Sequence, residues 1–159
     1  MKLNFLFLLF VLFSCSTDKD EVEPDQKINE KKAKEQIIGT WAIQGNTTLY
    51  YDNSGGLLHA ASRGTGYHPY TFTSTTRSNS FWIEGAFIRD ELPYTIYTED
   101  GKVLIRLGDG PNENINEITY MDSKEMVWRQ EASNAEYFLN SRTEVAAKSV
   151  WNQIYRRVE

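Results

Sequence analysis

The sequence is poor in the residues that most often hold metals or form covalent bonds. Its one cysteine, Cys15, cannot form a disulfide within the chain and leaves no thiol elsewhere. Its two histidines, His59 and His68, have no Asp or Glu at ligand spacing. Because a zinc site needs three or four convergent ligands, we expect no metal site and no cofactor.

A basic surface and a recognisable catalytic nucleophile are also missing. Asp and Glu outnumber Lys and Arg by 22 to 17, and the formal net charge is -5. A nucleic-acid partner requires a basic face, so we expect no nucleic acid to bind. The Gly-x-Ser-x-Gly motif of many hydrolases is absent. We therefore expect that the protein is not an enzyme. Carboxylates paired in space for glycoside hydrolysis are a third, less favoured possibility.

The apolar run at the N-terminus extends only from Leu3 to Phe13 and follows Lys2. A membrane-spanning helix needs about 20 residues, whereas a signal-peptide core is shorter. The run therefore indicates a secretory signal peptide rather than a membrane span.

The residues that close this run, Leu12-Phe13-Ser14-Cys15, resemble the bacterial lipoprotein box. The resemblance implies that residues 1–14 are a cleaved signal peptide and that Cys15 is acylated, for example with palmitate. Several acyl chains would hold the protein on a membrane of the cell envelope, and we expect the outer membrane. An ordinary secretory signal with an unrelated cysteine is the alternative.

Residues 15–35 form a charged segment with no aromatic side chain, a composition typical of a flexible linker. Its acidic start, Asp18-Lys19-Asp20-Glu21, resembles the export signal of some surface-exposed lipoproteins, but a solvated linker has the same composition. Residues 27–37 favour a short helix, since Glu30 and Lys34 can pair one turn apart.

Residues 36–159 have the pattern of a single all-β domain. Aromatic residues make up 13% of the chain, and segments with alternating apolar residues are separated by turn-forming residues such as Asp52–Gly56 and Glu99–Gly101. The spacing predicts about eight to ten short antiparallel strands. Within Ser80–Arg89 we expect a bulge at Gly85 or a strand covered on both faces, and Arg142–Lys148 has weak helical character.

Five short motifs stand out in the predicted strands: Gly39-Thr40-Trp41, Tyr94-Thr95-Ile96, Lys102-Val103-Leu104-Ile105, Glu125-Met126-Val127-Trp128 and Tyr155-Arg156-Arg157-Val158. Together they resemble the lipocalin-like domain of bacterial lipoproteins. The resemblance implies an antiparallel up-and-down barrel over residues 36–159, in which Arg156 or Arg157 packs over Trp41 of the first strand.

A barrel of this size either fills its interior with side chains or encloses one small ligand. Inward aromatic residues with a few polar tips would suit an apolar or sugar-like molecule. In the alternative interpretation, all of these residues belong to a filled hydrophobic core, and the barrel contacts an envelope protein through its exterior. The candidate ligand-binding residues are Tyr70, Phe72, Tyr94, Ile96, Tyr120 and Trp128.

Overall fold

A computed structural model describes residues 28–64, 68–111 and 113–159 of the chain. The predicted signal peptide, Cys15 and most of the charged linker lie outside these residues. The elements are α1 (Glu30–Gln36), β1 (Gly39–Tyr51), β2 (Leu57–Arg63), β3 (Tyr70–Phe72), β4 (Thr76–Ile83), β5 (Ala86–Glu99), β6 (Lys102–Leu107), β7 (Asn114–Met121), β8 (Glu125–Leu139) and β9 (Arg142–Arg157).

The short helix expected before the sheet is α1. The side chain of Asn29 caps it by accepting a hydrogen bond from the backbone N–H of Lys32, at 2.9 Å. Glu30 and Lys34 form the expected ion pair at 2.6 Å. Ala33 on the helix and Ile37 just after it are fully buried in the core, so α1 packs against the barrel.

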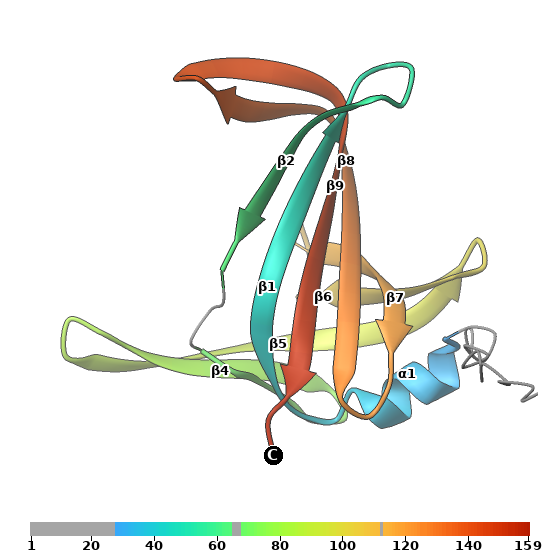
Figure 1. The fold of residues 1–159 in the computed structure, drawn as a ribbon. Coiled ribbons are helices and arrows are strands. Elements are labelled where there is room, and N and C mark those ends of the chain that lie inside the picture. The colour runs from blue at the N-terminus through green and yellow to red at the C-terminus, as the bar shows by residue number, and fades with distance from the viewer. Residues whose placement is uncertain (1–27, 65–67, 112) are drawn as a thin grey trace, which may run out of the picture.

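The strands form a closed antiparallel barrel (Figure 1), which confirms the predicted all-β up-and-down fold. Strands β3 to β9 follow one another in sequence order, and β1 closes the ring by pairing with β3 on one side and β9 on the other. Strand β2 is additional and pairs only with the second half of β1, from Asn46 to Tyr51. The barrel thus contains eight strands, with β2 as a ninth.

Two local expectations are wrong. Gly85 is not in a bulge: Glu84 and Gly85 form a two-residue turn in which both have positive φ, 49° and 82°. This geometry suits the twist of a tight hairpin. Arg142–Lys148 is the first half of strand β9 rather than a helix, because its residues pair with β8 across a second tight turn at Asn140 and Ser141.

The first-strand motif Gly39-Thr40-Trp41 closes one end of the barrel. Trp41 is fully buried, and its indole N–H donates to the carbonyl of Ile37 at 2.7 Å. The guanidinium of Arg157 lies 4.3 Å from the Trp41 ring. It also donates to the carbonyls of Gln36, Ile38 and Ser123, the last two at 2.8 Å. The predicted arginine over Trp41 is therefore confirmed as Arg157.

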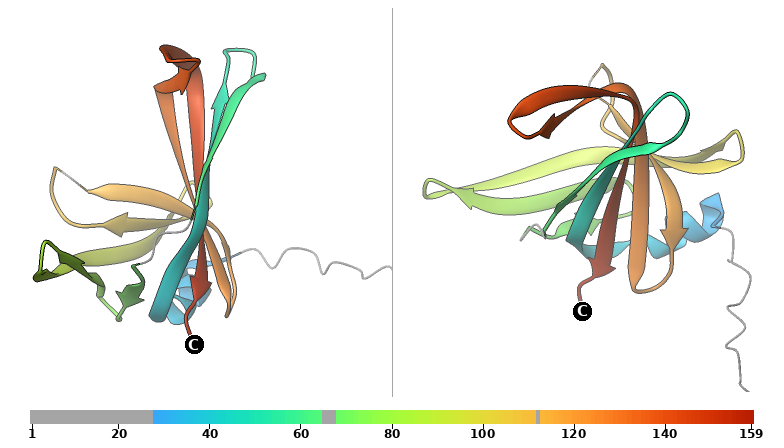
Figure 2. Two further views of the ribbon diagram at one scale, coloured as in Figure 1. Left: turned by 60° about the vertical axis from the view of Figure 1, so that its left-hand side comes forward. Right: turned by 45° about the horizontal axis from the view of Figure 1, so that its top comes forward.

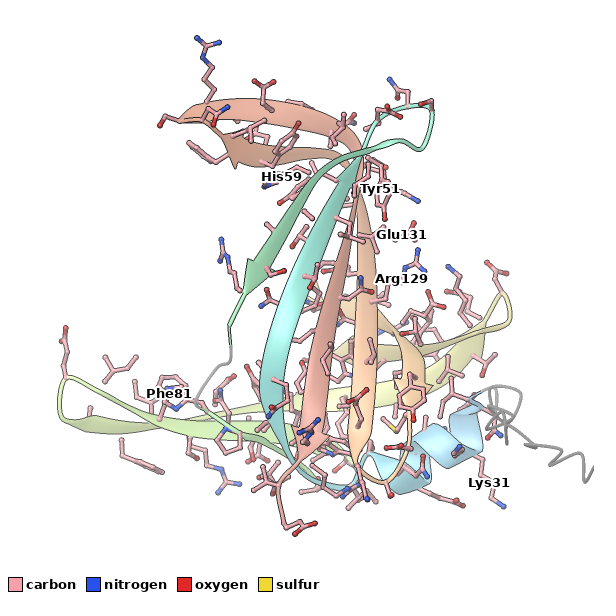
Figure 3. All side chains as sticks on the ribbon, viewed as in Figure 1. Lys31, Tyr51, His59, Phe81, Arg129 and Glu131 are labelled. Atoms are coloured by element: carbon pink, nitrogen blue, oxygen red, sulfur yellow. The ribbon has the colours of Figure 1, made fainter. Side chains whose placement is uncertain are left out.

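Two hairpins extend beyond the barrel (Figure 2). The β4–β5 hairpin projects from its side, and the end of the β8–β9 hairpin bends away from the long axis of these strands. Next to the second hairpin, β2, β1, β9 and β8 form a sheet extension, residues 46–63 and 129–152. Tyr137 of this extension stacks on His59, with ring centroids 5.3 Å apart, and packs on Tyr50 at 4.8 Å. Figure 3 shows His59 below the bent hairpin.

Candidate ligand-binding site

The structure brings together several of the six predicted ligand-binding residues. Phe72, Ile96 and Trp128 are almost fully buried in one core cluster, and Tyr70 and Tyr94 pack against it half-buried. The Phe72 ring lies edge-on to Tyr94 at 5.5 Å and to Trp128 at 6.0 Å. These five residues line the inside of the barrel, and their role in binding stays a prediction.

Tyr120 lies apart from the other five. Its side chain is 41% exposed, and its hydroxyl donates to the carboxylate of Asp122 at 2.8 Å. Simple alternation from the buried Ile118 would have turned Tyr120 inward. A register shift between Ile118 and Tyr120 reverses the alternation, because a bulge adds one residue to its strand.

Three inward amide side chains lie next to the aromatic core and were missed from the sequence. We call Asn79, Asn116 and Gln153 the amide layer. Residues that pair across antiparallel strands point to the same face of a sheet. The strand partners of these amides are Tyr70, Ile105 and Trp128 respectively, all of which belong to the core or pack on it.

Two members of the amide layer, Asn116 and Gln153, are buried, Asn79 is half-buried, and the hydrogen-bonding capacity of the layer is incompletely used. Asn116 is 2% exposed and Gln153 is 9% exposed. The oxygens Asn116 Oδ1 and Asn79 Oδ1 have no partner among the described residues, and neither does the indole nitrogen of Trp128. Asn116 Nδ2 donates to Asn114 Oδ1 at 2.8 Å. Buried polar atoms without a partner are rare in native proteins, and these three atoms could form hydrogen bonds with a ligand or with water.

Tyr155 connects the amide layer to the aromatic rings. Its hydroxyl donates to Gln153 Oε1 at 2.5 Å, and its ring lies 4.7 Å from that of Trp128. Burial raises the pKa of Tyr155 well above its usual value; the nearby Tyr70 adds to this rise and Arg77 opposes it. The hydroxyl is therefore protonated at physiological pH and acts as a fixed donor.

Arg77 is the cation beside this layer; it forms an ion pair with the 45% exposed side chain of Asp90, and its buried Nε has no hydrogen-bond partner among the described residues. Its guanidinium lies 4.8 Å from the Tyr70 ring and 3.4 Å from the carboxylate of Asp90. Asp90 also pairs with Asn79 across β4 and β5, which places its carboxylate on the inner face. The wall around the amide layer therefore carries one positive and one negative charge.

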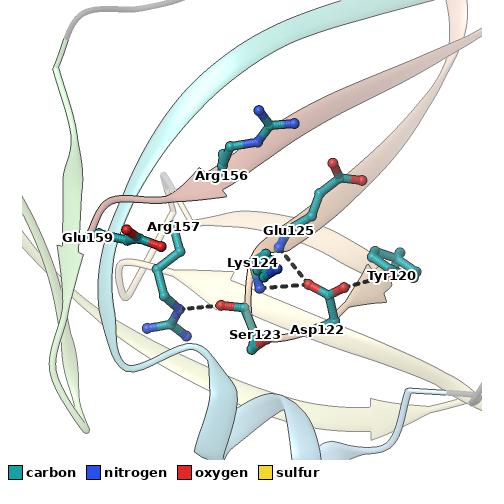
Figure 4. A pocket seen from close by; sticks show the side chains of 8 residues that line it. All are labelled: Tyr120, Asp122, Ser123, Lys124, Glu125, Arg156, Arg157 and Glu159. Carbon is teal, nitrogen blue, oxygen red and sulfur yellow. Dashed lines mark hydrogen bonds between the residues drawn. The ribbon is translucent and has the colours of Figure 1, made fainter.

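A surface cavity of about 550 Å³ lies at the end of the barrel that Arg157 closes (Figure 4). Its three cations and three carboxylates balance, so it presents no net charge to a ligand. Arg157 is held by backbone carbonyls, and Asp122 accepts hydrogen bonds from the backbone N–H groups of Lys124 and Glu125. The lining residues are Tyr120, Asp122, Ser123, Lys124, Glu125, Arg156, Arg157 and Glu159.

In the part of the chain that the structure describes, no group of three His, Cys, Asp or Glu side chains is arranged to hold a metal ion. None of the helices in the same residues has the length and apolar character needed to cross a membrane.

Comparisons with known proteins give the chain no family. No protein-family model matches the sequence, and no curated protein matches it. Among solved structures, the chain is similar to the crystal structure of an uncharacterized protein from Bacteroides eggerthii DSM 20697. The TM-score is 0.40 and the sequence identity is 9%, over 77% of this chain and 99% of that chain. A likeness at this level shows nothing about the function of this chain.

Proposed function

We propose that this protein is a lipid-anchored, non-catalytic barrel that binds a small molecule against its inner wall. The closed barrel supplies the rigid wall, and the aromatic core supplies an apolar surface on which a ligand can rest. The anchor is the acylated Cys15 expected from the sequence, which would hold the barrel at the outer membrane of a bacterial cell.

One observation carries the proposal: the buried polar atoms of Trp128, Asn116 and Asn79 have no partner among the described residues. Leaving a buried donor or acceptor unpaired costs about 1–3 kcal/mol. A chain that only needed to fill its barrel would be more stable with apolar side chains at these positions. Retaining them is favourable if a ligand completes their hydrogen bonds.

A second candidate function is an interaction protein that contacts an envelope partner through its exterior. The part of the barrel next to α1 is filled by side chains, including Ile37, Trp41 and Met126. The end of the β8–β9 hairpin exposes apolar residues, with Phe138 75% and Val145 62% exposed. Exposed apolar patches of this kind often mark protein contacts.

Native mass spectrometry of the mature protein, purified from the cells that produce it, separates the two functions. We expect a small molecule in a one-to-one complex with the wild-type protein. The variant Asn79→Leu should lose this molecule, and Asn152→Leu, an amide on the outer face of β9, should keep it. A wild-type protein that carries only water would contradict ligand binding and favour the interaction protein.

A further inference from the structure

We infer that the barrel binds a neutral, hydroxylated ring molecule, such as a sugar unit, at the amide layer. This inference rests on the proposed ligand-binding function and names the chemical class of the ligand. It follows from the hydrogen-bonding groups, the charge and the ring surfaces on the inner wall.

The hydrogen-bonding groups of the layer offer both donors and acceptors to a ligand. The carbonyl oxygens of Asn79 and Asn116 are available acceptors, and the indole N–H of Trp128 is an available donor. Hydroxyl groups both donate and accept, so a hydroxylated ligand can satisfy all three. An alkyl chain would satisfy none of them and would leave each buried atom unpaired.

The balanced charge of the inner wall favours a neutral ligand, and the buried Nε–H of Arg77 is one more donor without a partner among the described residues. Arg77 is paired with Asp90 at 3.4 Å, and its guanidinium also faces the ring of Tyr70 at 4.8 Å. An anionic ligand beside Arg77 would also meet the carboxylate of Asp90, and a cationic ligand beside Asp90 would meet Arg77. The amides, Tyr155 and Trp128 add no charge, because burial keeps the Tyr155 hydroxyl protonated.

Tyr70 is the half-buried aromatic ring next to the layer and suits the apolar face of a ring. It stands edge-on to Tyr155 at 6.3 Å, and behind it Tyr155 and Trp128, each 2% exposed, pack on each other at 4.7 Å. An aromatic surface bordered by amides can contact the C–H face of a sugar while the amides bind its hydroxyls. A linear polyol has the hydroxyls but lacks this flat face.

A probe series on the full-length protein tests the inference. The probes are glucose and N-acetylglucosamine as neutral rings, glucose 6-phosphate as a charged ring, sorbitol as a linear polyol and dodecanol as an apolar chain. Isothermal titration calorimetry measures affinity, and the part of the tryptophan fluorescence change that Trp128→Phe removes reports on Trp128 among the four tryptophans. We expect a neutral ring to bind at least tenfold more tightly than each of the other three probe types.

Matched variants assign the binding to the amide layer. Asn79→Leu should weaken the best neutral probe by tenfold or more, and Trp128→Phe, which removes only the indole N–H donor and part of the ring, should also weaken it. Asn152→Leu on the outer face should leave the affinity within twofold of the wild type. Equal affinities for Asn79→Leu and wild type would overturn the assignment.

The outcomes also separate this inference from the proposed function. Preference for dodecanol, for sorbitol or for the phosphate ester would overturn the neutral-ring class while leaving ligand binding intact. If no probe binds, the molecule that co-purifies with the native protein decides: a neutral hydroxylated ring supports the inference, and a charged or purely apolar molecule overturns it. If no probe binds and nothing co-purifies, both the inference and the proposed function fail.

Discussion

The backbone conformation and close surroundings of residue 39 explain why the first-strand motif begins with glycine. Its φ is +130°, in a region that side chains rarely adopt, and a Cβ at this position would overlap the guanidinium of Arg157. The glycine therefore allows Arg157 to reach the carbonyls of Gln36 and Ile38 and to cover the Trp41 ring.

Gly39→Ala should lower the free energy of unfolding by about 1–3 kcal/mol, because it imposes backbone strain and displaces Arg157. Urea denaturation followed by circular dichroism measures the change. Gly64→Ala is the matched control, since Gly64 has open space around its Cα and no positive φ. Equal midpoints for the two variants would contradict this account of Gly39.

Arg157 and its neighbour Arg156 offer a second matched pair. Arg157→Met removes hydrogen bonds to three carbonyls and the contact with Trp41, so we expect a loss of about 2–4 kcal/mol. Arg156 is exposed on the other face of β9, and Arg156→Met should change stability by less than about 0.5 kcal/mol. Thermal unfolding of both variants at one pH makes the comparison. A stable Arg157→Met variant would show that Trp41 packing alone closes this end of the barrel.

At the scale of the element, the β7–β8 turn depends on the ionised side chain of Asp122. Burial alone would raise the pKa of Asp122, but the N–H groups of Glu125 and Lys124 and the hydroxyl of Tyr120 outweigh it and bring the pKa below its usual value. A pKa that is lower in the folded than in the unfolded protein stabilises the fold above the unfolded pKa of about 4. That contribution disappears as the pH falls through the folded pKa.

The variant Asp122→Asn should therefore show a weaker acid dependence than the wild type. The amide oxygen still accepts the two backbone hydrogen bonds but does not titrate, so the variant keeps the turn. Between about pH 4 and pH 2, the free energy of unfolding of the wild type should fall more steeply than that of the variant. Chemical denaturation at a series of pH values measures both slopes, and parallel curves would contradict a role for the charge.

The elements themselves were predictable where local chemistry decides them. The Asp100-Gly101 turn and the capped helix α1 follow from residues close together in the chain, and both were expected. The inward amides and the outward Tyr120 depend on register and on the bulge after Ile118, which arise from pairing between strands. No local signal marks that bulge. Asn116 lies two residues before Ile118, and side chains two residues apart in a strand point to the same face. This alternation is the sequence signal that could have placed the Asn116 side chain inside the barrel.

At the scale of the whole molecule, the barrel and the sheet extension have separate cores. The barrel cluster centres on Trp41 and Trp128, whereas Tyr137, Ala146 and Val150 are buried outside that cluster. Strands β1, β8 and β9 run through both parts, so the extension is continuous with the barrel.

Hydrogen exchange should therefore reveal two levels of protection. Backbone N–H groups of β6 and β7 should exchange only on global unfolding. Backbone N–H groups near the β8–β9 turn should exchange faster, through local opening. Mass spectrometry of peptic fragments resolves these segments. Tyr137→Ala should accelerate exchange in residues 132–149 and leave β6 unchanged. Acceleration throughout the chain would instead show that the two cores unfold as one unit.

The hydrogen bonds of Arg157 to the carbonyls of Gln36 and Ile38 hold the end of β9 beside the residues that precede β1. Helix α1 and the C-terminus emerge at one end of the barrel, and the sheet extension points the opposite way (Figure 1). An affinity tag appended after Glu159 would attach the protein to a sensor chip by that end. The extension would then face the flowing solution, accessible to any analyte passed over the surface.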